Sequence, residues 1–217
     1  MSNLSKRLQV ALSFLHGING FADIGCDHGY LPIEAINRNI VNFAIASDNK
    51  RGPFLKAKNN IELAGLTEKI EVRLEDGIGS YPQTIDAIAI LGMGGELIVQ
   101  ILEKANLDNI AILVLGPNSE AKQVRFFLQK AGYTIDDESF IKDHNHYYQT
   151  IRAIKGNMNL SLQEAIFGPI NIQKKNPILL EFVNNEIAKL NQGLKKAKQE
   201  SKKIIEQKIN ELREVIL

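Results

Sequence analysis

The chain has 217 residues, of which 44% are hydrophobic and 24% charged, and its formal net charge at pH 7 is only +1. This length accommodates one full α/β domain and a smaller appendage, and the composition is that of a globular protein. Because the charges nearly balance, bulk charge gives no argument for nucleic-acid binding.

The composition predicts a cytoplasmic protein that uses no metal. Its single cysteine, Cys26, has no partner for an internal disulfide, which suits a reducing cytosol. The N-terminus lacks the apolar core of a signal peptide, and no run of about 18 apolar residues would span a membrane. The four histidines and one cysteine show no metal-ligand spacing. We therefore expect neither membrane contact nor a metal site.

An amphipathic helix is predicted before the first strand, because leucines recur at helical spacing over residues 4–15. Lys6 and Arg7 lie near its start. They form either a solvated face or a pair of cations that meet a phosphate.

Residues 21–32 predict a short apolar strand, a turn rich in glycine and carboxylate, and the start of a helix. Gly25 and Gly29 readily adopt positive φ and let a ligand approach the backbone closely. The helix start offers unpaired N–H groups. Asp23 and Asp27 would repel phosphates but suit a ligand that carries hydroxyls and positive charge. S-adenosylmethionine, with its ribose, ammonium and sulfonium, matches this description.

The glycine spacing separates two kinds of nucleotide-binding turn. The dinucleotide fingerprint needs glycine at its first, third and sixth positions, and the run from Gly25 to Tyr30 fails at the third and the sixth. The methyltransferase pattern acidic-x-Gly-x-Gly-x-Gly fits better, although Asp27 stands where the middle glycine is usual. Since aspartate tolerates left-handed conformations, Asp27 has either a structural or a functional role there.

Strand and helix patterns then alternate along the chain. Further strands are expected at 43–47, 70–74, 85–91 and 110–115, with helices at 32–38, 53–64, 96–105 and 120–130. Two more strands, 133–141 and 147–154, give an antiparallel ending. The pattern predicts an α/β fold of the Rossmann-like, class I methyltransferase type, with a mostly parallel seven-stranded sheet.

Acidic residues follow two of these strands, where an open parallel sheet binds its ligands. Asp48, followed by Asn49, lies 23 positions beyond Gly25, close to where an acidic residue accepts ribose hydroxyls. The alternative for Asp48 is a helix cap. Asp76, next to Gly77, either accepts a hydrogen bond from the adenine amino group or merely fills a turn.

A second glycine turn, Gly92-Met93-Gly94-Gly95, follows the fourth strand. We expect it beside the first turn, where its bare backbone borders the transferred methyl group. The (Asn/Asp)-Pro-Pro-aromatic motif of adenine-N6 methyltransferases is missing from this position.

The C-terminal residues differ in charge and pattern from the rest. Residues 1–156 carry 16 basic and 18 acidic side chains (net −2), whereas residues 157–217 carry 10 and 7 (net +3). After a short helical pattern and a break at Gly168-Pro169, two helical patterns run from Pro177 to Ile216. They predict a coiled-coil-like antiparallel hairpin. Its five lysines at 195–203 form either a solvated bend or a phosphate-contacting arm. We therefore divide the chain into a methyltransferase domain, 1–156, and a helical hairpin, 157–217.

Several of these motifs together resemble the bacterial TrmK family, over the whole chain. They are the segment 4–8, the run 22–32, the turn 92–95, Pro117-Asn118 and Tyr147-Tyr148. The Asp-His-x-Tyr-Leu-Pro run and the Gly-Met-Gly-Gly turn are the specific parts. Two departures, Cys26 for a common serine and Asp48 for a common glutamate, keep the size or charge of the side chain.

The resemblance implies an S-adenosylmethionine-dependent tRNA (adenine-N1)-methyltransferase that acts on adenine 22, in the D-arm region. Cofactor binding is then expected from Asp23, Gly25, Cys26, His28, Gly29, Asp48, Asn49, Asp76, Gly77, Gly92, Met93 and Gly94. Contacts to tRNA or its flipped base are expected from Lys6, Arg7, Tyr30, Pro117, Asn118, Tyr148, Lys195, Lys196 and Lys198. We expect this enzyme to act as a monomer and without a metal.

Methylation at N1 leaves a cationic adenine, whose charge a nearby carboxylate stabilises. Asp27 is the expected catalytic residue, either as that stabiliser or as the group that takes a proton from the exocyclic amine. N1 lies on the Watson–Crick edge, so a paired adenine must first be exposed or flipped. Tyr147 and Tyr148 point to opposite faces of their strand. One is therefore expected in the core and the other against a base.

Two other functions stay open. One is a methyltransferase for a different RNA base, a small molecule or a protein. If the substrate were a small molecule or a protein, the enzyme would need no RNA and the basic hairpin would be unexplained. A non-catalytic module, whose hairpin binds protein and whose glycine turn is vestigial, would ignore the cofactor.

Overall fold

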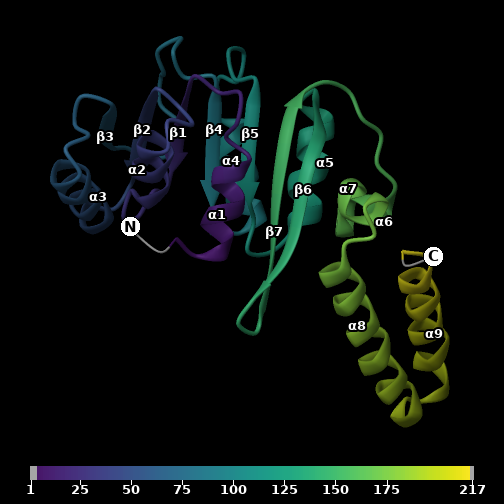
Figure 1. Cartoon of the computed structure of the whole chain (residues 1–217). Coiled ribbons are helices and arrows are strands. Elements are labelled where there is room, and N and C mark those ends of the chain that lie inside the picture. Colours follow the sequence, from purple (N-terminus) through teal and green to yellow (C-terminus); the bar gives the residue numbers. More distant parts are fainter. Residues whose placement is uncertain (1–3, 216–217) are drawn as a thin grey trace.

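Seven strands form one sheet in the order β3-β2-β1-β4-β5-β7-β6 in the computed structural model, which describes residues 4–215 (Figure 1). The strands are β1 Gly20–Ile24, β2 Phe43–Asp48, β3 Ile70–Leu74, β4 Ala87–Leu91, β5 Ile112–Gly116, β6 Tyr133–Asp143 and β7 His146–Lys155. The first five run parallel, and β7 is antiparallel to both of its neighbours. The predicted Rossmann-like sheet is confirmed.

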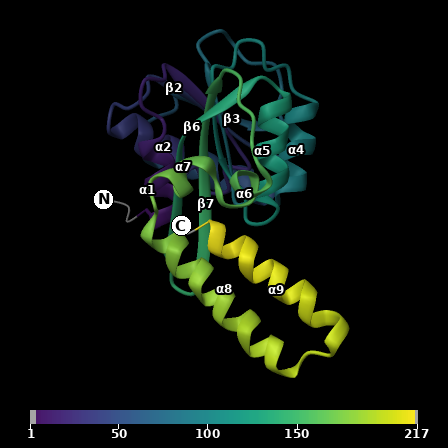
Figure 2. The ribbon, with the colours of Figure 1, turned by 90° about the vertical axis from the view of Figure 1, so that its right-hand side faces the viewer.

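Helices cover both faces of this sheet. They are α1 Lys6–Ser13, α2 Tyr30–Asn37, α3 Arg51–Leu63, α4 Gly95–Glu103 and α5 Ala121–Lys130, followed by α6 Leu162–Phe167, α7 Pro169–Gln173, α8 Pro177–Lys196 and α9 Gln199–Glu214. Figure 2 shows α1 and α2 on one face of the sheet, and α4 and α5 on the other. Residues 87–90 of β4 are fully buried between these two layers, which explains why that strand reads as a continuous apolar run.

The order of the strands places the ends of β1 and β4 next to each other at a switch point. From β1 the chain continues to β2 on one side, whereas β4 leads to β5 on the other. Open α/β sheets bind ligands in the crevice that such a reversal creates. The glycine turns at Gly25 and Gly92 therefore border the same crevice.

The N-terminal helix is held beside this crevice by β7. The Arg152 guanidinium donates to the carbonyl oxygens of Phe14 and His16, at 3.0 and 3.5 Å, and forms an ion pair with Asp136. Because these carbonyls directly follow α1, the helix is fixed against the sheet.

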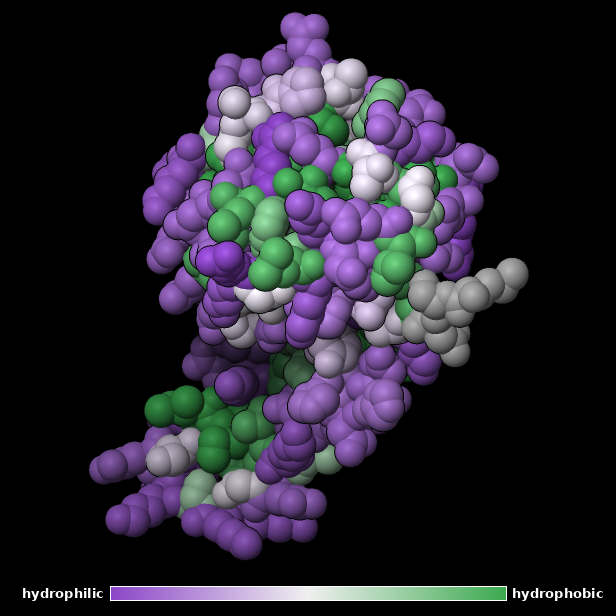
Figure 3. Space-filling view, turned by 90° about the vertical axis from the view of Figure 1, so that its left-hand side faces the viewer, coloured by the Kyte–Doolittle hydropathy of each residue, from purple (hydrophilic) through white to green (hydrophobic). Residues whose placement is uncertain are grey.

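Helices α8 and α9 lie side by side and run in opposite directions (Figures 1 and 2). Figure 1 shows this arm extending beyond the sheet on the side toward which the arrow of β4 points. Its inner contacts are apolar, since Leu179, Val183, Ile209 and Leu212 are buried. Figure 3 shows an apolar patch on the surface of the arm, next to hydrophilic side chains. The coiled-coil-like packing stays a prediction, and Ile216 lies outside the described residues.

The segment between sheet and arm differs from the sequence expectation in one respect. The predicted break at Gly168-Pro169 separates α6 from a second short helix, α7, which the sequence analysis did not predict. Pro169 stands at the first helical position, where its missing N–H costs no hydrogen bond. Both helices pack on the sheet domain, α6 against α5 and α7 against β6. The division at residue 156 remains a prediction.

Among the described residues, no helix has the length and apolar character needed to cross a membrane.

Candidate active site

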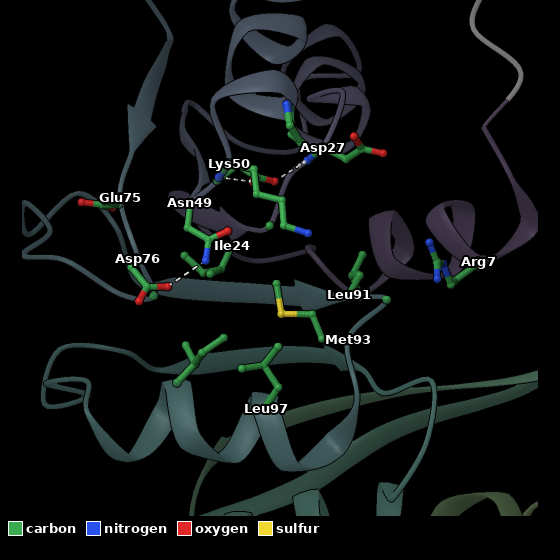
Figure 4. Close-up of a pocket in the computed structure, with 16 residues that line it drawn as sticks. Arg7, Ile24, Asp27, Asn49, Lys50, Glu75, Asp76, Leu91, Met93 and Leu97 are labelled. Atoms are coloured by element: carbon green, nitrogen blue, oxygen red, sulfur yellow. Dashed lines mark hydrogen bonds between the residues drawn. The ribbon is translucent and has the colours of Figure 1, made fainter.

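A cavity of about 460 Å³ opens at the carboxyl edge of the parallel strands, between the turns that follow β1, β2, β3 and β4 (Figure 4). The predicted site residues that line it are Arg7, Gly25, Asp27, Asp48, Asn49, Asp76, Gly77, Gly92 and Met93. Segments that are far apart in the sequence meet here because parallel strands end at one edge of the sheet.

The first glycine turn is fixed to the neighbouring strand through its backbone. The N–H groups of Gly25 and Cys26 donate to the carbonyl oxygen of Ser47, at 2.8 and 3.0 Å. Gly25 has a φ of 72°, and a Cβ added there would lie 2.2 Å from Cε of Met93. The cavity wall at this point is therefore bare backbone, faced by the Met93 side chain of the second turn.

Asp27 occupies the position where the methyltransferase pattern has glycine, and it adopts a φ of 49°. Left-handed backbone at a residue other than glycine is strained and concentrates at functional sites. Its side chain is 64% exposed, and its carboxylate lies 3.5 Å from Nε2 of His28. Figure 4 shows Asp27 and Arg7 at one end of the cavity and Asp76 at the other.

Three carboxylates, those of Asp48, Glu75 and Asp76, line the part of the cavity that follows β2 and β3, and the sequence analysis did not predict Glu75. Asp48 is almost fully buried, and its Oδ1 accepts a hydrogen bond from the Lys50 N–H at 2.9 Å. Its Oδ2 lies 3.4 Å from the N–H of Asp27. Asn49 donates to Oδ1 of Asp76 at 3.0 Å, which leaves the other Asp76 oxygen available. Asp48 thus orders the turn before α3 and borders the cavity, but it is not the cap of that helix, because the N-cap residue of α3 is Lys50.

Apolar side chains form the opposite wall, and the sequence analysis missed them. Leu97 and Ile101 lie one turn apart on α4, and the Leu97 side chain is 48% exposed within the cavity lining. The sequence analysis predicted a helix at 96–105 without assigning a ligand contact to its apolar residues, although their spacing directly after a glycine turn was a usable signal. Lys50, also missed, points into the cavity in Figure 4 and directly follows Asp48-Asn49 in the sequence.

Asp23 and Cys26 lie beneath the first turn, beside a smaller cavity of about 100 Å³ that His28 and Tyr30 also line. Burial, and then the nearby Asp48, raise the pKa of Asp23 to about 7. Burial also raises the pKa of the Cys26 thiol, assisted by the negative charge of Asp23. Cys26 therefore stays protonated at neutral pH.

A third cavity, of about 290 Å³, is lined by Arg7, Asn118, His146, Tyr147 and Tyr148. The two tyrosines differ in their surroundings. The Tyr147 ring packs on Phe182 of α8 at a centroid distance of 5.0 Å, and its hydroxyl donates to Glu181. The Tyr148 ring instead faces the guanidinium of Arg7. Tyr147 is thus the core tyrosine between sheet and arm.

The other predicted residues do not line these three cavities. Gly29 and Gly94 precede α2 and α4 as backbone caps, Lys6 is exposed on α1, and Pro117 is buried. Lys195, Lys196 and Lys198 are exposed at the far tip of the arm (Figure 1). Within residues 4–215, no group of three or more His, Cys, Asp or Glu side chains is placed to hold a metal ion.

With this geometry in place, comparison with known proteins identifies the family. The model of the family "TrmK: tRNA (adenine(22)-N(1))-methyltransferase" matches residues 21–216. The chain belongs to the TrmK family. The resemblance inferred from the two glycine turns is confirmed.

Known proteins with similar sequences or structures match this chain over most of their length. A tRNA (adenine(22)-N(1))-methyltransferase of Bacillus subtilis is 36% identical over 193 residues, which cover 85% of this chain and 81% of that protein. The structure of Streptococcus pneumoniae Sp1610 in complex with S-adenosyl-L-methionine superposes with a TM-score of 0.89 and 35% identity, covering 99% of this chain and 100% of that one. M. capricolum TrmK, in complex with S-adenosyl-homocysteine, superposes with a TM-score of 0.87 and 30% identity, covering 99% and 98%.

Proposed function

We propose that this chain transfers a methyl group from S-adenosylmethionine to N1 of adenine 22 in tRNA. The family match over residues 21–216 is the observation that supports this reaction. We assign the reaction to the acidic, glycine-lined cavity at the switch point of the sheet.

The residues of the cavity fit S-adenosylmethionine, which supplies an electrophilic methyl group on a sulfonium. Asp48 accepts hydrogen bonds from the ribose hydroxyls, and Asp76 accepts a hydrogen bond from the adenine amino group. Leu97 and Ile101 provide apolar contact for the adenine ring. The four carboxylates that line this cavity repel phosphates, so the site disfavours a dinucleotide.

The two glycine turns shape the remainder of the cofactor site. The bare backbone of Gly25 and Gly92 allows close approach, and Met93 packs between them. Asn49 orients Asp76 through its hydrogen bond. The other turn residues, Asp23, Cys26, His28, Gly29, Gly77 and Gly94, hold the backbone that the cofactor contacts.

Asp27 is the catalytic residue of this proposal. When the lone pair of adenine N1 attacks the methyl carbon, the bond from that carbon to sulfur breaks, its electron pair stays on sulfur as the neutral thioether leaves, and the adenine ring gains the positive charge. The exposed Asp27 carboxylate, at the Arg7 end of the cavity, either stabilises that charge or accepts a proton from the exocyclic amine.

The tRNA contacts both the sheet domain and the arm. Tyr30 and Asn118 border the side where the flipped base enters, and the buried Pro117 precedes Asn118 in the same turn. Residues 157–217, with 10 basic and 7 acidic side chains, attract the RNA backbone through the lysines at the arm tip. We expect one chain to suffice for the reaction, and we expect it to act in the cytoplasm.

Incubation of unmodified tRNA with radiolabelled S-adenosylmethionine tests the proposal, followed by mapping of the methylated position. We expect label on N1 of adenine 22, and none in a matched tRNA that carries guanine at this position. Label in both tRNAs, or on another base, would contradict the assignment of the substrate. Incorporation into small molecules without RNA would favour the alternative methyltransferase.

A further inference from the structure

Arg7 is the residue at which all three cavities of the site meet. It lines the cofactor cavity, the small cavity beneath the first turn and the cavity on the Tyr148 side. It also touches the second glycine turn, because a Cβ added at Gly92 would lie 3.1 Å from its Nη1. Arg7 thus separates the cofactor from the place where the base enters.

The guanidinium of Arg7 is held by two neighbours that carry no charge. Its Nη1 donates to Oδ1 of Asn118 at 3.3 Å, and its Cζ lies 5.6 Å from the centre of the Tyr148 ring. Asn118 is itself fixed, because its side-chain amide donates to the Gly92 carbonyl oxygen at 2.7 Å. The position of the guanidinium is therefore set by the surrounding turn and strand.

Within residues 4–215, no carboxylate forms an ion pair with Arg7. A cation–π contact with a ring occupies none of the N–H donors of a guanidinium. One of these groups is used by Asn118, and the remaining donors form a planar fork that suits an oxyanion. An oriented, uncompensated arginine at the rim of a site is a ready anion-binding group.

We propose that Arg7 binds the backbone phosphate of the extruded target nucleotide, and that Tyr148 and Asn118 are positioning residues for its guanidinium. The inference rests on the proposed function, since it takes the anion from tRNA. It also assigns Tyr148 a different task from the expected one, because the tyrosine supports Arg7 rather than stacking on the base.

The carboxylate of the cofactor's methionine is the other anion within reach of this end of the cavity. The phosphate is favoured because both residues that orient Arg7 line the cavity on the Tyr148 side and neither lines the cofactor cavity.

Binding of tRNA to the full chain, measured as a function of salt, tests the phosphate contact. We expect Arg7→Gln to weaken tRNA binding about tenfold and to reduce the slope of log affinity against log salt by about one. Affinity for S-adenosylhomocysteine should stay as in the wild type, which also shows that the variant is folded. Lys58→Gln, which removes one exposed charge from α3, is the matched control and should leave the slope almost unchanged.

A double-mutant cycle separates the two roles of Tyr148. If the ring positions Arg7, Tyr148→Leu weakens tRNA binding severalfold in the wild type but adds nothing in the Arg7→Gln background. Tyr148→Phe, which keeps the ring, should bind tRNA normally. An equal loss from Tyr148→Leu in both backgrounds would overturn the positioning role and indicate stacking on the base.

Two other outcomes would overturn the phosphate assignment. One is an unchanged salt slope in Arg7→Gln. The other is weaker binding of S-adenosylhomocysteine with normal binding of 5′-methylthioadenosine, which lacks the amino acid, because the anion would then be the cofactor's carboxylate. Failure of the proposed function is recognised separately, since the wild type itself would then not methylate adenine 22.

Discussion

Asp23 is the residue in which burial at the site has the clearest consequence for stability. It lies at the end of β1, and burial together with Asp48 raises its pKa from 3.8 to about 7. Well below pH 3.8 the carboxyl is neutral in the folded and the unfolded chain, so it costs nothing. As the pH rises toward 7, the unfolded chain ionises first, and the folded state loses up to about 4 kcal/mol of stability.

Asp23→Asn should therefore stabilise the free protein at pH 8, because the amide keeps the size of the side chain and removes the buried ionisation. We expect its urea midpoint to exceed that of the wild type at pH 8, and the difference to shrink steadily as the pH falls toward 4. Urea unfolding curves of both proteins at several pH values measure this difference in midpoint. A midpoint difference that is independent of pH would contradict the assigned pKa.

At the scale of secondary-structure elements, a buried polar network joins the sheet to the helices that lead into the arm. Arg125 of α5 donates to Glu138 of β6 and to Gln149 of β7, each at 2.7 Å, and to the carbonyl oxygen of Ala165 in α6 at 3.1 Å. Glu138 also accepts the N–H of Ile170 in α7 at 3.0 Å. Since Arg125 is fully buried, one guanidinium connects four elements.

Arg125→Met should destabilise the fold by about 3–5 kcal/mol, because it leaves the buried Glu138 carboxylate without its partner. The double variant Arg125→Met/Glu138→Leu removes both charges and should recover a large part of this loss. Urea unfolding monitored by circular dichroism gives both values. If the double variant were less stable than Arg125→Met, the uncompensated charge would not be the cause.

Sequence periodicity predicted the elements well where each element buries one continuous apolar pattern. The apolar run at 85–91 and the turn after it indicated both β4 and the crevice at its end. Sequence periodicity did not predict contacts between side chains that are distant in the chain. The pairing of Arg125 with Glu138 follows from the packing of α5 on β6, which no local pattern encodes.

The residues of the candidate site were predictable where they follow directly from the order of strands and turns. Glycines and carboxylates at strand ends located Gly25, Asp48 and Asp76 on the cavity wall, because parallel strands end together. The choice between Tyr147 and Tyr148 required the position of α8, which packs on Tyr147. The sequence therefore left that alternative open.

At the scale of the whole molecule, the cavity lies at the carboxyl ends of the parallel strands, and the arm extends on the side toward which the arrow of β4 points (Figure 1). The lysine-rich tip lies far from the cavity, so a ligand that contacts both must be large. A folded tRNA meets this requirement, whereas a small-molecule substrate would leave the arm unused.

The triple variant Lys195→Gln/Lys196→Gln/Lys198→Gln should weaken tRNA binding and lower its salt slope by about two to three, because each lysine contacts about one phosphate. Binding of S-adenosylhomocysteine should not change. Lys56→Gln/Lys58→Gln/Lys69→Gln removes the same charge from the sheet domain and serves as the control. Equal effects of the two triple variants would show that net charge, rather than the arm, attracts the RNA.

The central claim is that the carboxylate of Asp27 supports methyl transfer to the purine that enters beside it. Single-turnover transfer to tRNA by Asp27→Asn, at saturating cofactor and tRNA, tests this most directly. Asparagine tolerates the left-handed backbone at this position, so the turn and the affinity for S-adenosylhomocysteine should persist. We predict that the rate falls about 100-fold or more. A rate equal to that of the wild type would contradict the account.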